Sequence, residues 1–306
     1  MRTPLLLLFA ILLTACPSGD PPADDDDSTE VDVCADSLSE GTVQVFATGL
    51  TGGTEGIAFS PDGRLFVSRG DVVMEVWADG RHEELAPIPA EVGLAWWNGE
   101  LIVASGDSGE PDGLGGVYAV DVDSGDVRLL AGGIPGANFP AVTPWGTLLV
   151  STPSGDEEIV EVTAAGEVTL WSDEVTSPNG IGFSEDGSAA YVATTFANPA
   201  PLWEVPIVDG VAQTPTEITS WGPGTAPDGV AMGESGAVYI AQNIAGRIDR
   251  VDPADGSEDA VGVGVQFAAS LAFGVGADWD PCAVYVTSLF SDELYVVGVG
   301  EPGLGL

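Results

Sequence analysis

The sequence predicts an all-β protein, a six-bladed β-propeller whose ring is closed by a strand near the amino terminus. Three observations lead to this prediction. The chain after residue 40 is rich in glycine, valine and turn-forming residues, and it has no long amphipathic helical pattern. A unit of short strands recurs at intervals of roughly 40 residues, the period of a propeller blade. One position of that unit repeatedly carries an oxygen-bearing side chain.

The repeating unit is clearest at residues 177–193, where a short strand, a tight turn and a second strand follow one another. The same pattern recurs at residues 55–68 and 228–241. Aligning the apolar residues of the three stretches places a polar residue at one shared position, namely Glu55, Asn179 and Asp228. Polar residues repeated at one position of a repeat indicate a shared site.

Extending the alignment along the chain gives six equivalent positions: Glu55, Val92, Asn138, Asn179, Asp228 and Ala269. Six units then fill residues 50–300, and the strand at residues 42–46 is expected to become the outer strand of the last blade. Closing the ring in this way removes an exposed sheet edge. A sandwich of hairpins is the alternative fold, but it would not repeat one polar position.

The amino terminus is predicted to be a bacterial lipoprotein signal peptide at residues 1–15, followed by an acidic, Pro/Asp-rich tether at residues 16–40. A positive start and a short apolar run lead to a stretch that resembles a lipobox, Leu13-Thr14-Ala15-Cys16. Lipidation of Cys16 would anchor the chain to the cell envelope. Pro17 after the cysteine favours the outer membrane, with the domain facing the periplasm or the exterior. A plain cleaved signal peptide is the alternative.

The composition of the whole chain excludes several classes of function for the remaining domain, residues 41–306. A formal net charge of −41 argues against nucleic acid as a partner, because its phosphates would be repelled. The chain has no lysine, which excludes Schiff-base chemistry and a Walker-type phosphate loop. With one histidine, His82, a three-histidine zinc site cannot form. We expect a monomer that contacts the membrane only through its lipid anchor.

Two cysteines remain once Cys16 is assigned to the lipid. They are Cys34 and Cys282, one near each end of the domain. In an oxidising compartment such a pair favours a disulfide that joins the ends of the ring. Two unpaired thiols are the alternative.

The aligned polar positions predict a cation site. First strands line the channel of a propeller, so Glu55, Asn138, Asn179 and Asp228 should face one another there. Two carboxylates and two carboxamides form an all-oxygen set that suits Ca²⁺, with Mg²⁺, Mn²⁺ or Zn²⁺ as alternatives. Without a cation, the two carboxylates should repel each other and the pKa of one should rise. Polar residues that bind only channel water are the alternative interpretation.

Three motifs resemble those of the senescence marker protein/gluconolactonase/luciferin-regenerating enzyme family, which includes regucalcin and is related to paraoxonase-type lactonases. They are Glu55-Gly56, Ser177-Pro178-Asn179-Gly180 and Pro227-Asp228-Gly229. The ending at residues 271–304 is similar to the family's last blade. The resemblance implies that Glu55, Asn179 and Asp228 bind a catalytic divalent cation. It also implies that Asn138 touches metal or substrate and that Asp228 handles the reacting water.

The residues expected to bind substrate depart from the family pattern. Gly136 stands where gluconolactonase-type members carry a substrate-holding arginine, and Phe139 follows Asn138 in place of the usual aspartate. Arg69 is a candidate for holding a substrate carboxylate, as is Arg247, although pairing with a surface acid is the simpler role for each. The glycine-rich stretch at residues 106–113 is a candidate cap.

Two functional hypotheses follow. The first is a divalent-metal-dependent hydrolase of lactones or related esters, in which the metal polarises the carbonyl and Asp228 acts on the attacking water. The second is a non-catalytic cell-surface binding propeller with a structural Ca²⁺. Fold alone does not separate them.

Overall fold

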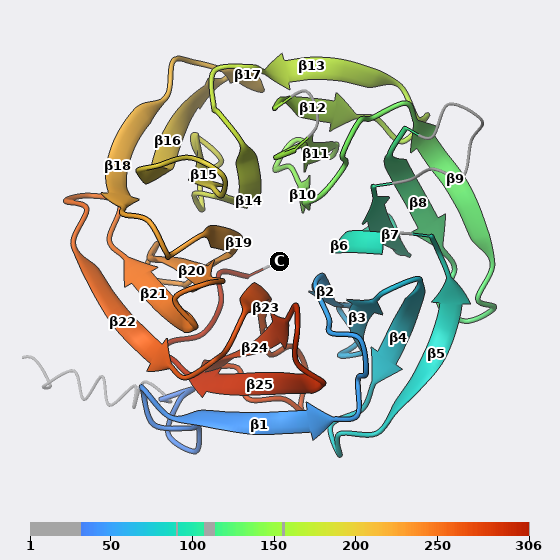
Figure 1. Ribbon diagram of the computed structural model, residues 1–306, viewed down its shortest axis with the longest axis vertical. Helices are drawn as coiled ribbons and strands as arrows, with labels where there is room; N and C mark the ends of the chain where they lie inside the picture. The colour runs from blue at the N-terminus through green and yellow to red at the C-terminus, as the bar shows by residue number, and fades with distance from the viewer. Residues whose placement is uncertain (1–31, 90, 107–113, 155–156, 306) are drawn as a thin grey trace, which may run out of the picture. The chain divides into compact units, whose positions relative to one another are not determined.

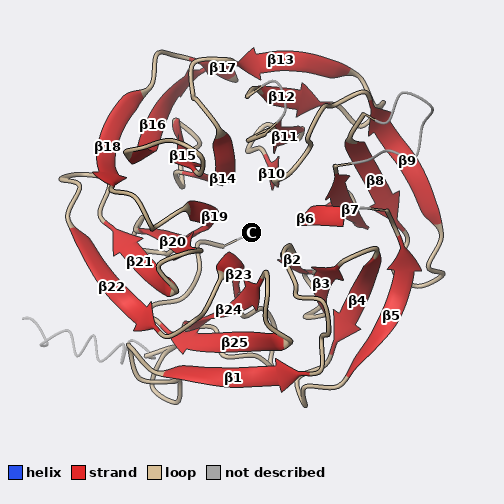
Figure 2. Ribbon diagram, in the orientation of Figure 1, coloured by secondary structure: helices blue, strands red, loops and turns tan. Residues whose placement is uncertain are grey.

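The structure, a computed structural model, describes residues 32–89, 91–106, 114–154 and 157–305. Residues 33–306 form one compact unit, in which six antiparallel sheets are arranged around a central channel (Figure 1). Its described part contains strands, turns and loops and no helix (Figure 2). The described residues therefore offer no helix long and apolar enough to cross a membrane. The predicted signal peptide and Cys16 lie outside the described residues.

Each blade is a meander whose first strand faces the channel. The first blade consists of β2 (Ile57–Phe59), β3 (Leu65–Arg69), β4 (Val72–Val76) and β5 (His82–Pro87). The second consists of β6 (Glu91–Trp97), β7 (Glu100–Ser105), β8 (Gly116–Val120) and β9 (Val127–Gly132). The third consists of β10 (Pro140–Val142), β11 (Leu148–Ser151), β12 (Ile159–Val162) and β13 (Val168–Ser172).

The fourth blade is longer than the sequence analysis expected. It consists of β14 (Pro178–Phe183), β15 (Ala189–Thr194), β16 (Ala200–Val208) and β18 (Thr216–Trp221), and β16 also forms a hairpin with β17 (Val211–Ala212). The fifth consists of β19 (Pro227–Met232), β20 (Val238–Gln242), β21 (Arg247–Val251) and β22 (Glu258–Val263).

The last blade closes the ring with strands from both ends of the chain. β23 (Ala268–Phe273), β24 (Ala283–Ser288) and β25 (Glu293–Gly298) are joined by β1 (Val43–Thr48), which pairs with β25 in antiparallel register. Blue β1 lies beside red β25 in Figure 1. Cys34 and Cys282 form a disulfide with a Cα–Cα distance of 5.6 Å, which ties the chain before β1 to the same blade. The predicted six-bladed fold and its closing strand are confirmed.

The core lies between the blades. Six clusters of buried apolar side chains are present in the described part, and each joins the facing surfaces of two neighbouring blades. Strands buried on both faces, such as β7 and β24, therefore consist of continuous apolar runs. Because every blade buries one face against each neighbour, the ring fixes how the first strands stand around the channel.

Candidate functional site

The four predicted site residues lie where inner strands begin. Asn179 is the second residue of β14 and Asp228 the second residue of β19. Glu55 and Asn138 come two residues before β2 and β10. Because the inner strands run in the same direction around the channel, these positions meet at one of its two openings, here called the site face.

A small cavity joins the aligned positions. It has a volume of about 10 Å³ and is lined by side chains that include Glu55, Asn138, Asp228, Val92 and Ala269. A space of this size holds about one water molecule or one ion. Five of the six aligned positions therefore line one cavity. The sixth, Asn179, is joined to it by a hydrogen bond to Asp228.

Asp228 is held by two carboxamides. Nδ2 of Asn179 donates to Asp228 Oδ1 at 2.8 Å, and Nδ2 of Asn243 donates to Asp228 Oδ2 at 3.3 Å. The carboxyl is buried, with a residue exposure of 9 %. Burial and the nearby Glu55 carboxylate raise the pKa of Asp228 well above its usual range, and the bonds from Asn179 and Asn243 lower it in part. The structure therefore bears out the expected carboxylate repulsion.

The amide group of Asn179 has one unused oxygen. Its Nδ2 also donates to Oγ1 of Thr195 at 2.8 Å, and the Thr195 hydroxyl donates in turn to the carbonyl of Pro227 at 2.6 Å. Both amide hydrogens are thus used. The Oδ1 atom of Asn179 is buried without a hydrogen-bond partner among the described residues. Such an atom is costly unless something else satisfies it.

The residues present fit a hard divalent cation. The buried oxygen of Asn179 and the carboxylate of Asp228 belong to directly bonded side chains, and Glu55 and Asn138 line the adjoining cavity. Oxygen donors of this kind suit Ca²⁺. In the described ranges no three or more His, Cys, Asp or Glu side chains gather closely enough to hold a metal ion, either at this cluster or away from it. The carboxamides therefore matter as much to this site as the carboxylates do.

Backbone contacts fix the two residues that precede their strands. The Thr287 hydroxyl donates to the carbonyl of Glu55 and accepts the backbone N–H of Ser270 at 2.8 Å. The carbonyl of Asn138 accepts a hydrogen bond from the backbone N–H of Gly93 at 2.9 Å. The backbone N–H of Asn138 donates to the carbonyl of Ser151 at 3.0 Å. Glu55 and Asn138 are therefore tied to neighbouring blades.

Sequence analysis missed Thr195 and Asn243, the residues that orient Asn179 and Asp228. Each directly follows the second strand of its blade, where Thr194 pairs with Pro178 and Gln242 with Pro227. The sequence contained a pattern that could have identified them, because Thr195 and Asn243 occupy the same position, directly after the second strand of their blades.

The other predicted site residues lie apart from this cluster. Arg69 pairs with Glu84 at 3.0 Å, and Arg247 pairs with Asp249 at 2.8 Å. Both arginines thus pair with an acidic side chain, which is the simpler of the two roles expected for them from the sequence. Residues 107–113 of the candidate cap lie outside the described residues.

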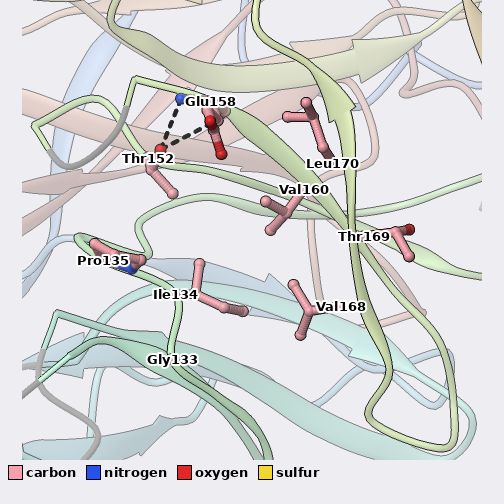
Figure 3. A pocket seen from close by; sticks show the side chains of 9 residues that line it. All are labelled: Gly133, Ile134, Pro135, Thr152, Glu158, Val160, Val168, Thr169 and Leu170. Carbon is pink, nitrogen blue, oxygen red and sulfur yellow. Dashed lines mark hydrogen bonds between the residues drawn. The ribbon is translucent and has the colours of Figure 1, made fainter. Parts of the chain in front are cut away.

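A larger cavity than the one at the oxygen cluster lies elsewhere. It has a volume of about 220 Å³ and lies between the second and third blades, against Ile134, Val160 and Leu170 (Figure 3). Its polar lining includes Thr152 and Glu158, which bond to each other through the Thr152 hydroxyl and the Glu158 backbone at 2.8 and 2.9 Å. Because this cavity lacks the oxygen cluster, size alone does not identify the site.

The fold and the oxygen-lined channel mouth define the class, a six-bladed β-propeller with a candidate cation site in its channel. The family model described as the SMP-30/gluconolactonase/LRE-like region matches residues 67–290. The chain therefore belongs to the SMP-30/gluconolactonase/LRE-like family. No curated protein matches the chain.

Several solved structures share the fold. A putative gluconolactonase is 19 % identical, with a TM-score of 0.71 over 88 % of this chain and 95 % of that one. The calcium-binding protein regucalcin from Agrobacterium tumefaciens is 23 % identical, with a TM-score of 0.68 over 86 % and 96 % of the two chains. A gluconolactonase from Xanthomonas campestris is 18 % identical, with a TM-score of 0.69 over 85 % and 89 %.

Proposed function

We propose that the protein is a divalent-cation-dependent hydrolase of lactones or related esters. The observation that carries the proposal is the buried, partnerless Oδ1 of Asn179 beside the buried carboxylate of Asp228. One cation would bind both the Asn179 oxygen and the Asp228 carboxylate. Glu55 and Asn138 would provide further oxygen ligands at the same cavity. Membership of the family, and its gluconolactonase and calcium-binding relatives, support the same class of activity.

The cation we propose is Ca²⁺, because all four donors are oxygens and two of them are neutral. Mg²⁺, Mn²⁺ and Zn²⁺ are the alternatives to be compared. When bound, the cation would supply a Lewis acid that polarises the ester carbonyl. Glu55, Asn138, Asn179 and Asp228 would hold it.

The proton chemistry falls to Asp228. Its carboxylate would accept a proton as a water oxygen bonds to the carbonyl carbon, and would return that proton to the ring or leaving-group oxygen as the carbon–oxygen bond breaks. Hydrogen bonds from Asn179 and Asn243 fix the carboxylate's orientation. Burial and the nearby Glu55 carboxylate raise its pKa above the usual range, which makes the carboxylate a stronger base.

The test is hydrolysis of a panel of lactones and aryl esters by the purified full chain. Each substrate would be assayed with Ca²⁺, with a chelator, and with the Asp228→Ala variant. We expect turnover that is lost on chelation and falls at least about 100-fold in the variant, as for removal of a catalytic group. The same assays with Mg²⁺, Mn²⁺ and Zn²⁺ would identify the preferred ion.

The binding-propeller hypothesis makes a different prediction for the same samples. If Ca²⁺ raises the melting temperature of the wild type and no substrate turns over, the cation is structural and the hydrolase proposal is wrong. Turnover that survives both chelation and Asp228→Ala would also contradict it.

Cell-envelope anchoring is a separate proposal that rests on the sequence. Lipidation of Cys16 would place the domain at the outer membrane, facing the periplasm or the exterior. Mass spectrometry of the mature amino terminus would show a diacylglyceryl cysteine if it is correct. An unmodified terminus would favour a plain secretory signal.

A further inference from the structure

Four large apolar side chains are exposed on the site face. They are Phe196, Ile244, Phe267 and Phe290, with exposures of 71, 64, 38 and 71 %. Three of them stand in the loops that follow β15, β20 and β24, and Phe267 directly precedes β23. The other exposed large hydrophobic residues of the described part are valines and leucines, most of them on outer strands. We call the four residues the apolar rim.

On the fourth and fifth blades, residues of the apolar rim directly follow residues that hydrogen-bond to the oxygen cluster. Phe196 directly follows Thr195, whose hydroxyl accepts the hydrogen bond from Asn179. Ile244 directly follows Asn243, whose amide donates to Asp228. Phe196 and Ile244 are therefore each adjacent in the chain to a residue that orients a candidate ligand of the cation.

On the last blade two rim residues pack together beside the same asparagine. The carbonyl of Phe267 accepts hydrogen bonds from Asn243 Nδ2 at 3.4 Å and from the backbone N–H of Leu289 at 3.0 Å. The rings of Phe267 and Phe290 meet edge to face, with centroids 5.2 Å apart. Their exposed surfaces thus form one aromatic patch next to the site.

The site face offers little to recognise a negatively charged substrate. The chain has no lysine. Its described arginines at this face are Arg69 and Arg247, and each is paired with a carboxylate, Glu84 or Asp249. With a formal net charge of −41, an anionic ligand would also approach against the field of the whole molecule.

We propose that the substrate is an uncharged lactone or ester that carries an apolar chain or ring, and that this apolar part lies on Phe196, Ile244, Phe267 and Phe290. This inference rests on the proposed function, which places the reacting carbonyl at the oxygen cluster. The apolar rim would contribute binding by removing the substrate's hydrocarbon from water. An acidic bilayer surface is a poorer occupant, because it would be repelled by the net charge.

The experiment measures dependence on chain length. The Ca²⁺-loaded full chain would be assayed with γ-lactones whose alkyl substituent grows from methyl to octyl, and kcat/KM would be compared along the series. In parallel, calorimetry would measure binding of the corresponding γ-lactams, which resist hydrolysis. We expect kcat/KM for the lactones and the association constant for the lactams each to rise about two- to fourfold for each added methylene, until the substituent covers the apolar rim.

Two variants show whether the rim is responsible. Phe196→Ala combined with Phe290→Ala should flatten the dependence of kcat/KM and of lactam affinity on chain length. Val211→Ala, which removes a similarly exposed side chain from the β16–β17 hairpin, should leave both series unchanged.

The outcomes separate this inference from the proposed function. Turnover of short lactones with no dependence on chain length would overturn the apolar substrate and leave the hydrolase intact. Lactam binding that rises with chain length, without turnover of any lactone, would support the rim and contradict the hydrolase. If neither lactams nor lactones show chain-length dependence, and the double variant instead loses association with phosphatidylcholine vesicles, the rim is a membrane surface and the inference is wrong.

Discussion

At the scale of single residues, the site is organised by carboxamides. Asn179 and Asn243 each donate to one oxygen of Asp228, so the carboxylate has a fixed orientation. The same bond commits the amide nitrogen of Asn179 and leaves its oxygen without a partner. A carboxylate at position 179 could not donate in this way and would add a third negative charge. This explains why the site combines amides with acids.

Asp228→Asn should remove the contribution of this carboxyl to the pH dependence of metal-free stability. The folded pKa of Asp228 is raised above the usual 3.8, so just above that value the metal-free native state retains a proton that the unfolded chain loses. Metal-free stability therefore falls as pH rises toward the folded pKa. Asparagine cannot ionise, so the variant should lack this loss and be more stable than wild type at pH 7 without Ca²⁺.

Ca²⁺ should affect the stability of the wild type and of the Asp228→Asn variant differently. It should stabilise the wild type at pH 7, less so as pH falls and protons compete for Asp228, and it should not stabilise the variant. Chemical denaturation at several pH values, with and without Ca²⁺, would measure this. Asp209→Asn, at an exposed turn, should behave as wild type. A Ca²⁺ effect that is equal in all three proteins would contradict the assignment of Asp228.

At the scale of strands, the glycine after the aligned position sets the width of the channel mouth. A Cβ on Gly180 would stand 2.4 Å from the carbonyl oxygen of Asp228 and 2.6 Å from the nitrogen of Val230. A Cβ on Gly93 would stand 2.2 Å from the carbonyl oxygen of Asn138. These neighbours are backbone atoms that cannot move aside, so glycine is what lets adjacent inner strands approach.

Gly180→Ala should therefore disturb both the fold and the site. We expect a loss of about 1–3 kcal/mol in the free energy of unfolding, as for overpacking in a core, and a weaker Ca²⁺ affinity because Asp228 is displaced. Gly222→Ala is the matched control, since its added Cβ would meet nothing within 4 Å and should change stability by less than about 0.5 kcal/mol. Denaturation and calorimetry would test both. Equal behaviour of the two variants would refute the close-approach argument.

At the scale of the whole molecule, the last blade is assembled from residues far apart in the chain. Cys34 and Cys282, separated by 248 residues, are joined by the disulfide. Beside it, Asp280 accepts the backbone N–H of Leu38 at 2.7 Å and that of Cys282 at 3.0 Å. Covalent and hydrogen bonds thus hold the start of the domain on the blade that β1 completes.

Removing this cross-link should weaken the closed ring. The double variant Cys34→Ala/Cys282→Ala should lose about 2–5 kcal/mol of stability, because its unfolded chain is no longer constrained by a long loop. A reducing agent should destabilise the wild type by a similar amount and leave the double variant unchanged, as measured by chemical denaturation. If the reduced wild type, with both thiols shown to be free, is as stable as the oxidised protein, the disulfide does not hold the ring closed.

The sequence alone determined the number of blades, the closing strand and the four aligned polar residues. It could do so because strand alternation, turn residues and a repeated polar position are local patterns, visible in each unit separately. The extra β16–β17 hairpin was not predicted, since the alignment expected four strands in every blade.

Only the tertiary structure decided how the aligned residues meet and what surrounds them. The hydrogen bonds that Asn179 donates to Thr195 and that Asn243 donates to Asp228 each join an inner strand to a loop of the same blade. The bond that Asn179 donates to Asp228 joins two blades, so no spacing within one unit reveals it. The unused oxygen of Asn179 depends on the direction in which its amide points. The apolar rim brings together loops of three blades, because ring closure places the ends of distant strands on one face.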